Sequence, residues 1–118
     1  MQPLRRTTLA LVAFTTLHVA TADVATVKVY ADQCAVCHGA DGKGQTPMGK
    51  KLKVSDWGDG KTLDRMTDTA LASEIRVGKL AMPGYPKLDD DQLKAMVEYV
   101  RSFQKQPGQR PAGSSVER

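Results

Sequence analysis

The sequence predicts an all-α domain, and three observations support this prediction. Residues 24–37 and 89–105 place apolar side chains at helical spacing, and a further helix is indicated between residues 67 and 77. No segment shows the alternating apolar and polar pattern of a strand over a useful length. The 118 residues, 41% hydrophobic and 25% charged, suffice for one ordinary globular domain.

Residues 1–22 have the three-part composition of a secretory signal peptide. Arg5 and Arg6 precede the uncharged apolar run Leu9–Val19, and Ala20-Thr21-Ala22 fits a small-residue cleavage site. The run is shorter than the roughly 20 residues of a membrane span, and an uncleaved anchor is the alternative interpretation. We therefore expect an exported, periplasmic protein that is cleaved after about Ala22.

Composition and charge exclude several classes of function. Cleavage would leave 96 residues and remove two arginines and no acid, which lowers the formal net charge from +4 to +2. This small charge, without a basic block interleaved with aromatics, argues against a nucleic-acid partner. The sequence has no glycine-rich phosphate loop, and its two cysteines cannot form a multi-bridge disulfide scaffold.

Three helices and two connecting segments are predicted for residues 23–105. The first helix covers residues 24–37, and its apolar stripe consists of Val24, Val27, Ala31 and Cys34, with Tyr30 beside it. Residues 38–66 are rich in glycine and lysine and are predicted to be a loop. The apolar residues of this loop that we expect to be buried or half-buried are Met48, Leu52, Val54 and Trp57.

The second half of the domain is predicted from its caps and its prolines. A helix begins at Thr67 or Asp68, where an N-cap candidate stands, and ends near Val77, before Gly78. Residues 79–88 form a connector that contains two prolines. The last helix opens with acids that suit its positive end, and its apolar stripe is Leu93, Met96, Val97, Val100 and Phe103. Residues 106–118 are predicted to be a flexible tail.

The segment Cys34-Ala35-Val36-Cys37-His38 carries the most informative chemistry. Two thiols on one helical turn can each add to a vinyl group of one haem, and the next histidine then lies beneath the iron as an axial ligand. This predicts one covalently attached haem c. The alternatives are a thioredoxin-like dithiol, a zinc site and a plain disulfide. The first needs a strand–helix context, and the second needs more ligands than the sequence supplies.

Met82 is the candidate for the second axial ligand of the iron. It lies 44 residues after His38, in the connector that Pro83 stiffens. A thioether is a soft, neutral donor that favours ferrous iron and raises the reduction potential. The other methionines are the initiator Met1, Met48 close to His38 in sequence, Met66 before the second helix, and Met96 on the last apolar stripe.

With these features the chain resembles the class I c-type cytochromes, especially small bacterial mono-haem members. The resemblance covers about residues 24–104, in the family's order. The matching residues are Tyr30, Cys34-Ala35-Val36-Cys37-His38-Gly39, Asp41-Gly42-Lys43-Gly44, Pro47, Met82-Pro83-Gly84-Tyr85 and Tyr99-Val100-Arg101. The resemblance implies the cytochrome c fold, in which three or more helices pack around one haem with His38 and Met82 on its two sides.

The same resemblance implies roles for three further residues. The backbone carbonyl of Pro47 is expected to accept a hydrogen bond from Nδ1 of His38, which would orient the imidazole. Trp57 is expected either beside the haem propionates or in ordinary packing. Thr26 stands where the family often has glycine, and a wider or shifted crossing of the first and last helices follows from it.

The expected function is that of a soluble, monomeric, mono-haem electron carrier without catalytic residues. Its partners would be redox proteins, including a membrane-bound or periplasmic oxidoreductase. A basic rim could steer an acidic partner, and it would consist of Lys43, Lys50, Lys51, Lys53 and Lys79. The alternative is a haem-based ligand-binding or peroxidase-like module in which Met82 is displaceable. A third possibility is the electron-accepting subunit of a larger complex.

Overall fold

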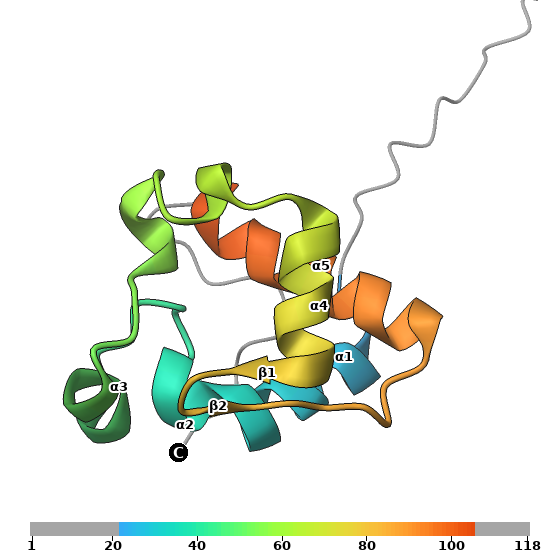
Figure 1. Ribbon diagram of the computed structural model, residues 1–118, viewed down its shortest axis with the longest axis horizontal. Coiled ribbons are helices and arrows are strands. Elements are labelled where there is room, and N and C mark those ends of the chain that lie inside the picture. The colour runs from blue at the N-terminus through green and yellow to red at the C-terminus, as the bar shows by residue number, and fades with distance from the viewer. Residues whose placement is uncertain (1–21, 106–118) are drawn as a thin grey trace, which may run out of the picture.

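Short helices make up most of the regular structure in residues 22–105, the part of the chain that the computed structural model describes (Figure 1). The predicted signal peptide, apart from residue 22, and the predicted tail 106–118 lie outside the described residues. None of the described helices is long and apolar enough to cross a membrane. The prediction of a mainly helical domain is confirmed, with the addition of a small two-stranded sheet.

The first predicted helix is a continuous helical segment made of three parts. These are α1 (Val24–Val29), the π-helical turn η1 (Tyr30–Cys34) and α2 (Ala35–His38). Asp23 caps the start, since its carboxylate accepts a hydrogen bond from the Thr26 N–H at 2.9 Å. Of the predicted apolar stripe, Val27 is buried, whereas Val24 is 84% exposed.

The segment predicted as a loop, residues 38–66, contains regular structure. It holds α3 (Pro47–Leu52) and the 3-10 turns η2 (Trp57–Asp59) and η3 (Leu63–Arg65). Thr46 caps α3 and Pro47 occupies its first turn. Trp57 is buried and Val54 is half-buried, as predicted, but Met48 and Leu52 lie on the exposed side of α3. Leu63, which was not expected to be buried, is fully buried.

The second half of the domain follows the prediction closely. Helix α4 (Asp68–Val77) begins after the Thr67 cap. In α5 (Asp90–Lys105) all residues of the predicted apolar stripe are buried. Between them, β1 (Gly78–Lys79) pairs antiparallel with β2 (Met82–Pro83), with Lys79 opposite Met82. Figure 1 shows this hairpin lying across the end of α4 and beside α2. The connector is therefore an ordered hairpin rather than only a proline-stiffened link.

An aromatic cluster joins the first and last helices. Tyr30 meets Tyr99 edge to face, with ring centroids 5.1 Å apart, and it lies 5.2 Å from Phe103. The buried Thr26 in α1 donates its hydroxyl to the Asp23 carboxylate at 2.7 Å. That hydrogen bond compensates for burying a polar side chain where the resemblance led us to expect glycine.

The tip of the hairpin combines an unusual backbone with an exposed apolar side chain. Leu80 has φ 54 and is 99% exposed. Because a left-handed backbone costs a residue with a Cβ roughly 1–2 kcal/mol, and asparagine tolerates it, Leu80→Asn should raise the free energy of unfolding by about 1 kcal/mol. Urea denaturation measures this. Val77→Asn, at an exposed position without positive φ, should give no gain, and equal midpoints for the wild type and Leu80→Asn would refute the prediction.

Candidate cofactor site

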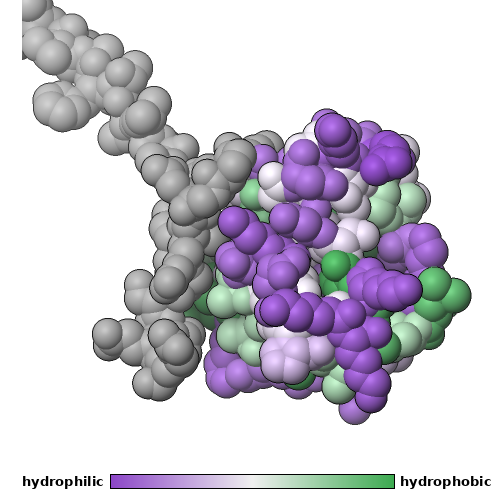
Figure 2. Space-filling view, turned by 90° about the vertical axis from the view of Figure 1, so that its left-hand side faces the viewer, coloured by the Kyte–Doolittle hydropathy of each residue, from purple (hydrophilic) through white to green (hydrophobic). Residues whose placement is uncertain are grey.

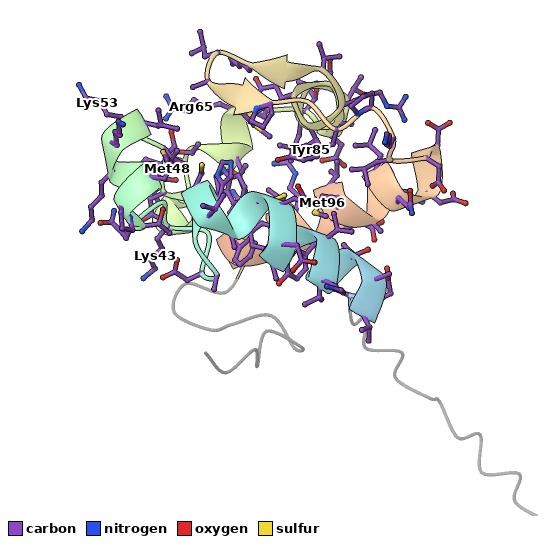
Figure 3. The ribbon with its side chains drawn as sticks, turned by 90° about the horizontal axis from the view of Figure 1, so that it is seen from below. Lys43, Met48, Lys53, Arg65, Tyr85 and Met96 are labelled. Atoms are coloured by element: carbon purple, nitrogen blue, oxygen red, sulfur yellow. The ribbon has the colours of Figure 1, made fainter. Side chains whose placement is uncertain are left out.

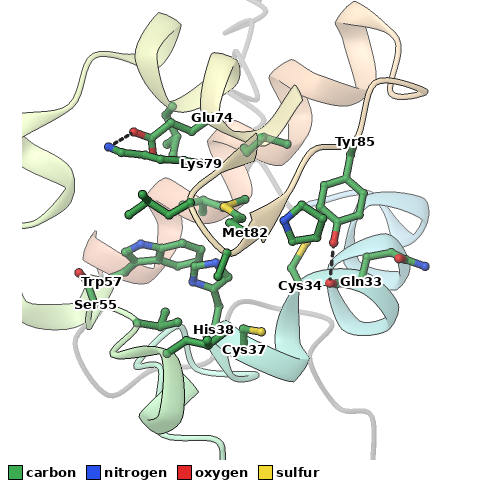
Figure 4. Close-up of a pocket in the computed structure, with 18 of the residues that line it drawn as sticks. Gln33, Cys34, Cys37, His38, Ser55, Trp57, Glu74, Lys79, Met82 and Tyr85 are labelled. Atoms are coloured by element: carbon green, nitrogen blue, oxygen red, sulfur yellow. Dashed lines mark hydrogen bonds and ion pairs between the residues drawn. The ribbon is translucent and has the colours of Figure 1, made fainter. Parts of the chain in front are cut away.

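A mostly apolar cavity of about 400 Å³ lies between the first helical segment, α4, α5 and the hairpin (Figure 4). This volume is in the range of small-molecule and cofactor sites. The residues that line it and were singled out in the sequence are Cys34, Cys37, His38, Trp57 and Met82. The structure thus gathers five of the six predicted site residues around one space, and Pro47 is the exception.

Cys34 and Cys37 form one wall of the cavity, one helical turn apart. Both side chains are half-buried and both are free thiols, which leaves them available for addition to a cofactor. Burial, with a smaller contribution from the charge of Cys37, raises the pKa of the Cys34 thiol to about 11. Cys34 is therefore protonated at neutral pH.

His38 stands at the end of α2, next to Cys37. Its imidazole stacks on the Trp57 indole, with ring centroids 4.1 Å apart and an angle of 16° between the planes. Burial lowers the pKa of His38, and a neutral imidazole is the form that binds metals. Nδ1 is buried and has no hydrogen-bond partner among residues 22–105. The stacking of Trp57 on the histidine ring was not anticipated.

The expected hydrogen bond from His38 Nδ1 to the Pro47 carbonyl is not formed in this structure. Pro47 is exposed, lies outside the cavity lining and opens helix α3. The carbonyl of a residue in a first helical turn points into the helix's own hydrogen-bond ladder. The loop before α3 instead contacts His38 through its backbone, since Gly44 donates its N–H to the His38 carbonyl at 2.8 Å.

Met82 reaches the cavity from the hairpin, on the side that faces α2 (Figure 4). Close backbone packing fixes this strand, since a Cβ on Gly84 would lie 2.5 Å from the Val77 carbonyl oxygen. Two other methionines, Met66 and Met96, also line the cavity, whereas Met48 lies outside it on α3. Two thiols, a neutral histidine and thioether sulfurs around an apolar cavity fit a haem held through sulfur and ligated by nitrogen and sulfur.

Sequence reasoning assigned no role to three residues that shape the site. Tyr30 donates its buried hydroxyl to the Gly39 carbonyl at 2.7 Å, which closes the turn after the His38 helix. Glu74 lines the cavity and pairs with Lys79 at 2.6 Å. Tyr85 also lines the cavity and donates its hydroxyl to the Gln33 carbonyl. Its position three residues after Met82 was visible in the sequence, but its partner was not.

Comparisons with known proteins match the chain to one family. The sequence profile of the family described as cytochrome C oxidase, cbb3-type, subunit III matches residues 23–100. The chain belongs to this family of c-type cytochrome domains. The domain takes part in electron transfer and carries covalently attached haem c, and its single Cys-Ala-Val-Cys-His motif fits one haem. The class I c-type cytochrome resemblance and the fold it implied are thereby confirmed.

Curated relatives and a solved structure share this domain. The cbb3-type cytochrome c oxidase subunit FixP of Rhizobium meliloti (strain 1021) is 35% identical over 79 residues, which are 64% of this chain and 26% of that protein. The subunit CcoP of Rhodobacter capsulatus is 32% identical over 81 residues, 64% of this chain and 27% of that protein. The chain thus spans about a quarter of their length. The c-type cytochrome KustC0563 superposes with a TM-score of 0.60 at 31% identity, over 67% of this chain and 96% of that one.

Proposed function

We propose that this c-type cytochrome domain, residues 23–105, is a mono-haem carrier that passes single electrons between redox partners, with His38 and Met82 as the axial ligands. One observation carries the proposal: both side chains line the same apolar cavity as the two free cysteines, from facing walls. The haem supplies the one-electron chemistry when bound. The chain's own residues attach it, fill its two axial positions and keep water from the iron.

The alternative of a ligand-binding or peroxidase-like module finds less support in the site. Such a module needs an open position at the iron and polar groups beside it. His38 is the sole histidine in residues 22–105, and no arginine lines the cavity. The charged side chains that line it are Glu74, Lys53 and Lys79, and Glu74 and Lys79 pair with each other.

The relatives suggest where the electrons go. FixP and CcoP are named as subunits of a cbb3-type cytochrome c oxidase. We propose that this domain exchanges electrons in the periplasm with a membrane-associated oxidoreductase, either as a free shuttle or as part of a complex. The signal peptide predicted for residues 1–22 is consistent with that compartment.

A visible spectrum tests the proposed axial ligands. The protein is expressed with haem-maturation machinery and examined in the ferric and ferrous states, with and without carbon monoxide. His/Met ligation gives a long-wavelength band in the ferric state and a ferrous spectrum that carbon monoxide leaves unchanged. A covalent haem without that band, or one that binds carbon monoxide readily, would favour the ligand-binding module instead.

Lysines near the cavity provide a basis for steering an anionic partner. Lys53 and Lys79 line the cavity, and Lys79 is partly neutralised by Glu74. Lys50 and Lys51 are exposed on α3, the side seen in Figure 2, where hydrophilic side chains cover most of the face. Figure 3 shows Lys43 and Lys53 at this same end of the molecule.

We therefore expect the rate of electron transfer from an acidic partner protein to fall as ionic strength rises. The Debye length shrinks from about 30 Å at 0.01 M to about 8 Å at 0.15 M, so attraction between the two surfaces weakens over this range. Stopped-flow reduction measures the rate, and Lys53→Gln should flatten the salt dependence, whereas Lys61→Gln, which lies away from the cavity lining, serves as the control. A salt-independent rate would contradict steering.

A further inference from the structure

The strand that carries Met82 is fixed firmly to one neighbour. Its backbone pairs with β1, Tyr85 donates its N–H to the Ile75 carbonyl of α4 at 2.9 Å, and Gly84 packs against the backbone at the end of α4. The first contact lies within the hairpin, and the other two join it to α4. None of them sets its distance from the helical segment that carries Cys34, Cys37 and His38.

A single side-chain hydrogen bond connects these two walls within residues 22–105. The Tyr85 hydroxyl donates to the Gln33 carbonyl at 3.0 Å and so joins residues 52 positions apart in the sequence (Figure 4). Gln33 belongs to the π-helical turn η1 and directly precedes Cys34. The Tyr85 bond therefore spans the gap between the Met82 strand and the start of the cysteine motif.

The hydroxyl of Tyr85 is protonated at neutral pH and donates the hydrogen bond. Burial raises its pKa above the ordinary value. The ring is half-buried and lines the cavity. Replacing Tyr85 by phenylalanine would remove the hydrogen bond and leave the ring contacts, so the two contributions can be separated.

We propose that Tyr85 is a positioning residue that latches the Met82 strand to the cysteine-bearing helix and so keeps the Met82 sulfur at the iron. This rests on the proposed function, in which Met82 is an axial ligand. An external ligand can occupy that position only when the Met82 strand has moved away, so its apparent affinity scales with the fraction of molecules that are open. Loss of one hydrogen bond of ordinary net strength raises that fraction about fivefold.

The test titrates the ferric haem protein with imidazole and follows the long-wavelength band of methionine ligation. Tyr85→Phe should bind imidazole about fivefold more tightly than the wild type. Tyr99→Phe is the matched control, because Tyr99 is a buried tyrosine of α5 that does not line the cavity. It should leave the imidazole affinity unchanged. Urea midpoints of both variants report any general loss of stability.

Each outcome either supports or overturns the proposed role of Tyr85. Tighter imidazole binding by Tyr85→Phe alone supports the latch. Equal affinity in Tyr85→Phe and the wild type overturns it, and so does an equal rise in both tyrosine variants, which would mean general loosening. A wild type that lacks the methionine band refutes the axial assignment and the latch with it. That failure appears before any variant is compared, and is therefore distinct from a failure of the latch alone.

Discussion

Met82→Ala is expected to convert a protein that does not bind carbon monoxide into one that does. If Met82 is the axial ligand, as proposed above, removing its thioether would open that position, and the apolar cavity lined by Leu71, Ile75 and Val100 would admit a small neutral ligand. Methionine ligation raises the potential of a haem, so the reduction midpoint should also fall. Carbon monoxide difference spectra and a redox titration measure the two effects.

Met66→Ala is the matched control, because Met66 also lines the cavity and loses the same atoms. It should keep the long-wavelength band and show no carbon monoxide binding. Met96 is a poorer control, since it is among the most buried side chains of the core and its truncation would cost several kcal/mol of stability. If Met66→Ala loses the band and Met82→Ala keeps it, the sulfur ligand comes from the 3-10 turn side of the cavity instead of the hairpin.

The parts of the fold that could be predicted are those where local signals and packing agree. Helix α4 has a threonine cap and a terminal glycine, and α5 has an uninterrupted apolar stripe. The helices in residues 38–66 are too short to show periodicity. Each forms only a few backbone hydrogen bonds, and these do not offset the free-energy cost of helix nucleation. Tertiary contacts stabilise them, and the sequence alone predicted a loop for this segment.

The candidate site likewise has a part that local sequence signals predicted and a part that depends on tertiary packing. Cys34, Cys37 and His38 are adjacent in sequence, so their spacing alone predicts that they act together. The stacking of Trp57 on His38 and the Tyr85 bond to Gln33 depend on how distant segments pack. The Pro47 carbonyl was assigned from resemblance, and in this structure Nδ1 of His38 has no hydrogen-bond partner among residues 22–105. Long-range pairings of this kind leave no periodic or spacing signal.

Gly49→Ala is expected to destabilise the domain by about 3 kcal/mol or more. Gly49 is buried in α3, and a Cβ there would lie 2.3 Å from the carbonyl oxygens of Cys37 and Gly44. Both obstacles are backbone atoms, so they cannot rotate away, and overpacking of this kind is costly. Alanine forms helices better than glycine by roughly 1 kcal/mol, but a clash this close outweighs that gain. Urea unfolding of the haem protein measures the loss.

Alanine substitutions at two other glycines separate the effect of the steric clash on stability from the effect of backbone conformation. At Gly58 a Cβ would lie 3.2 Å from the Asp56 carboxylate oxygen that accepts the Gly58 N–H. This side-chain atom needs to shift by only a few tenths of an ångström, so Gly58→Ala should change stability by less than about 0.5 kcal/mol. Gly60 has φ 68 and nothing within 4 Å, so Gly60→Ala should cost about 1 kcal/mol from backbone strain alone. Equal stability of Gly49→Ala and Gly58→Ala would refute the close approach of α3 to Cys37. The predicted order, with Gly49→Ala far the worst, requires the turn after His38 to be held by direct backbone contact with α3.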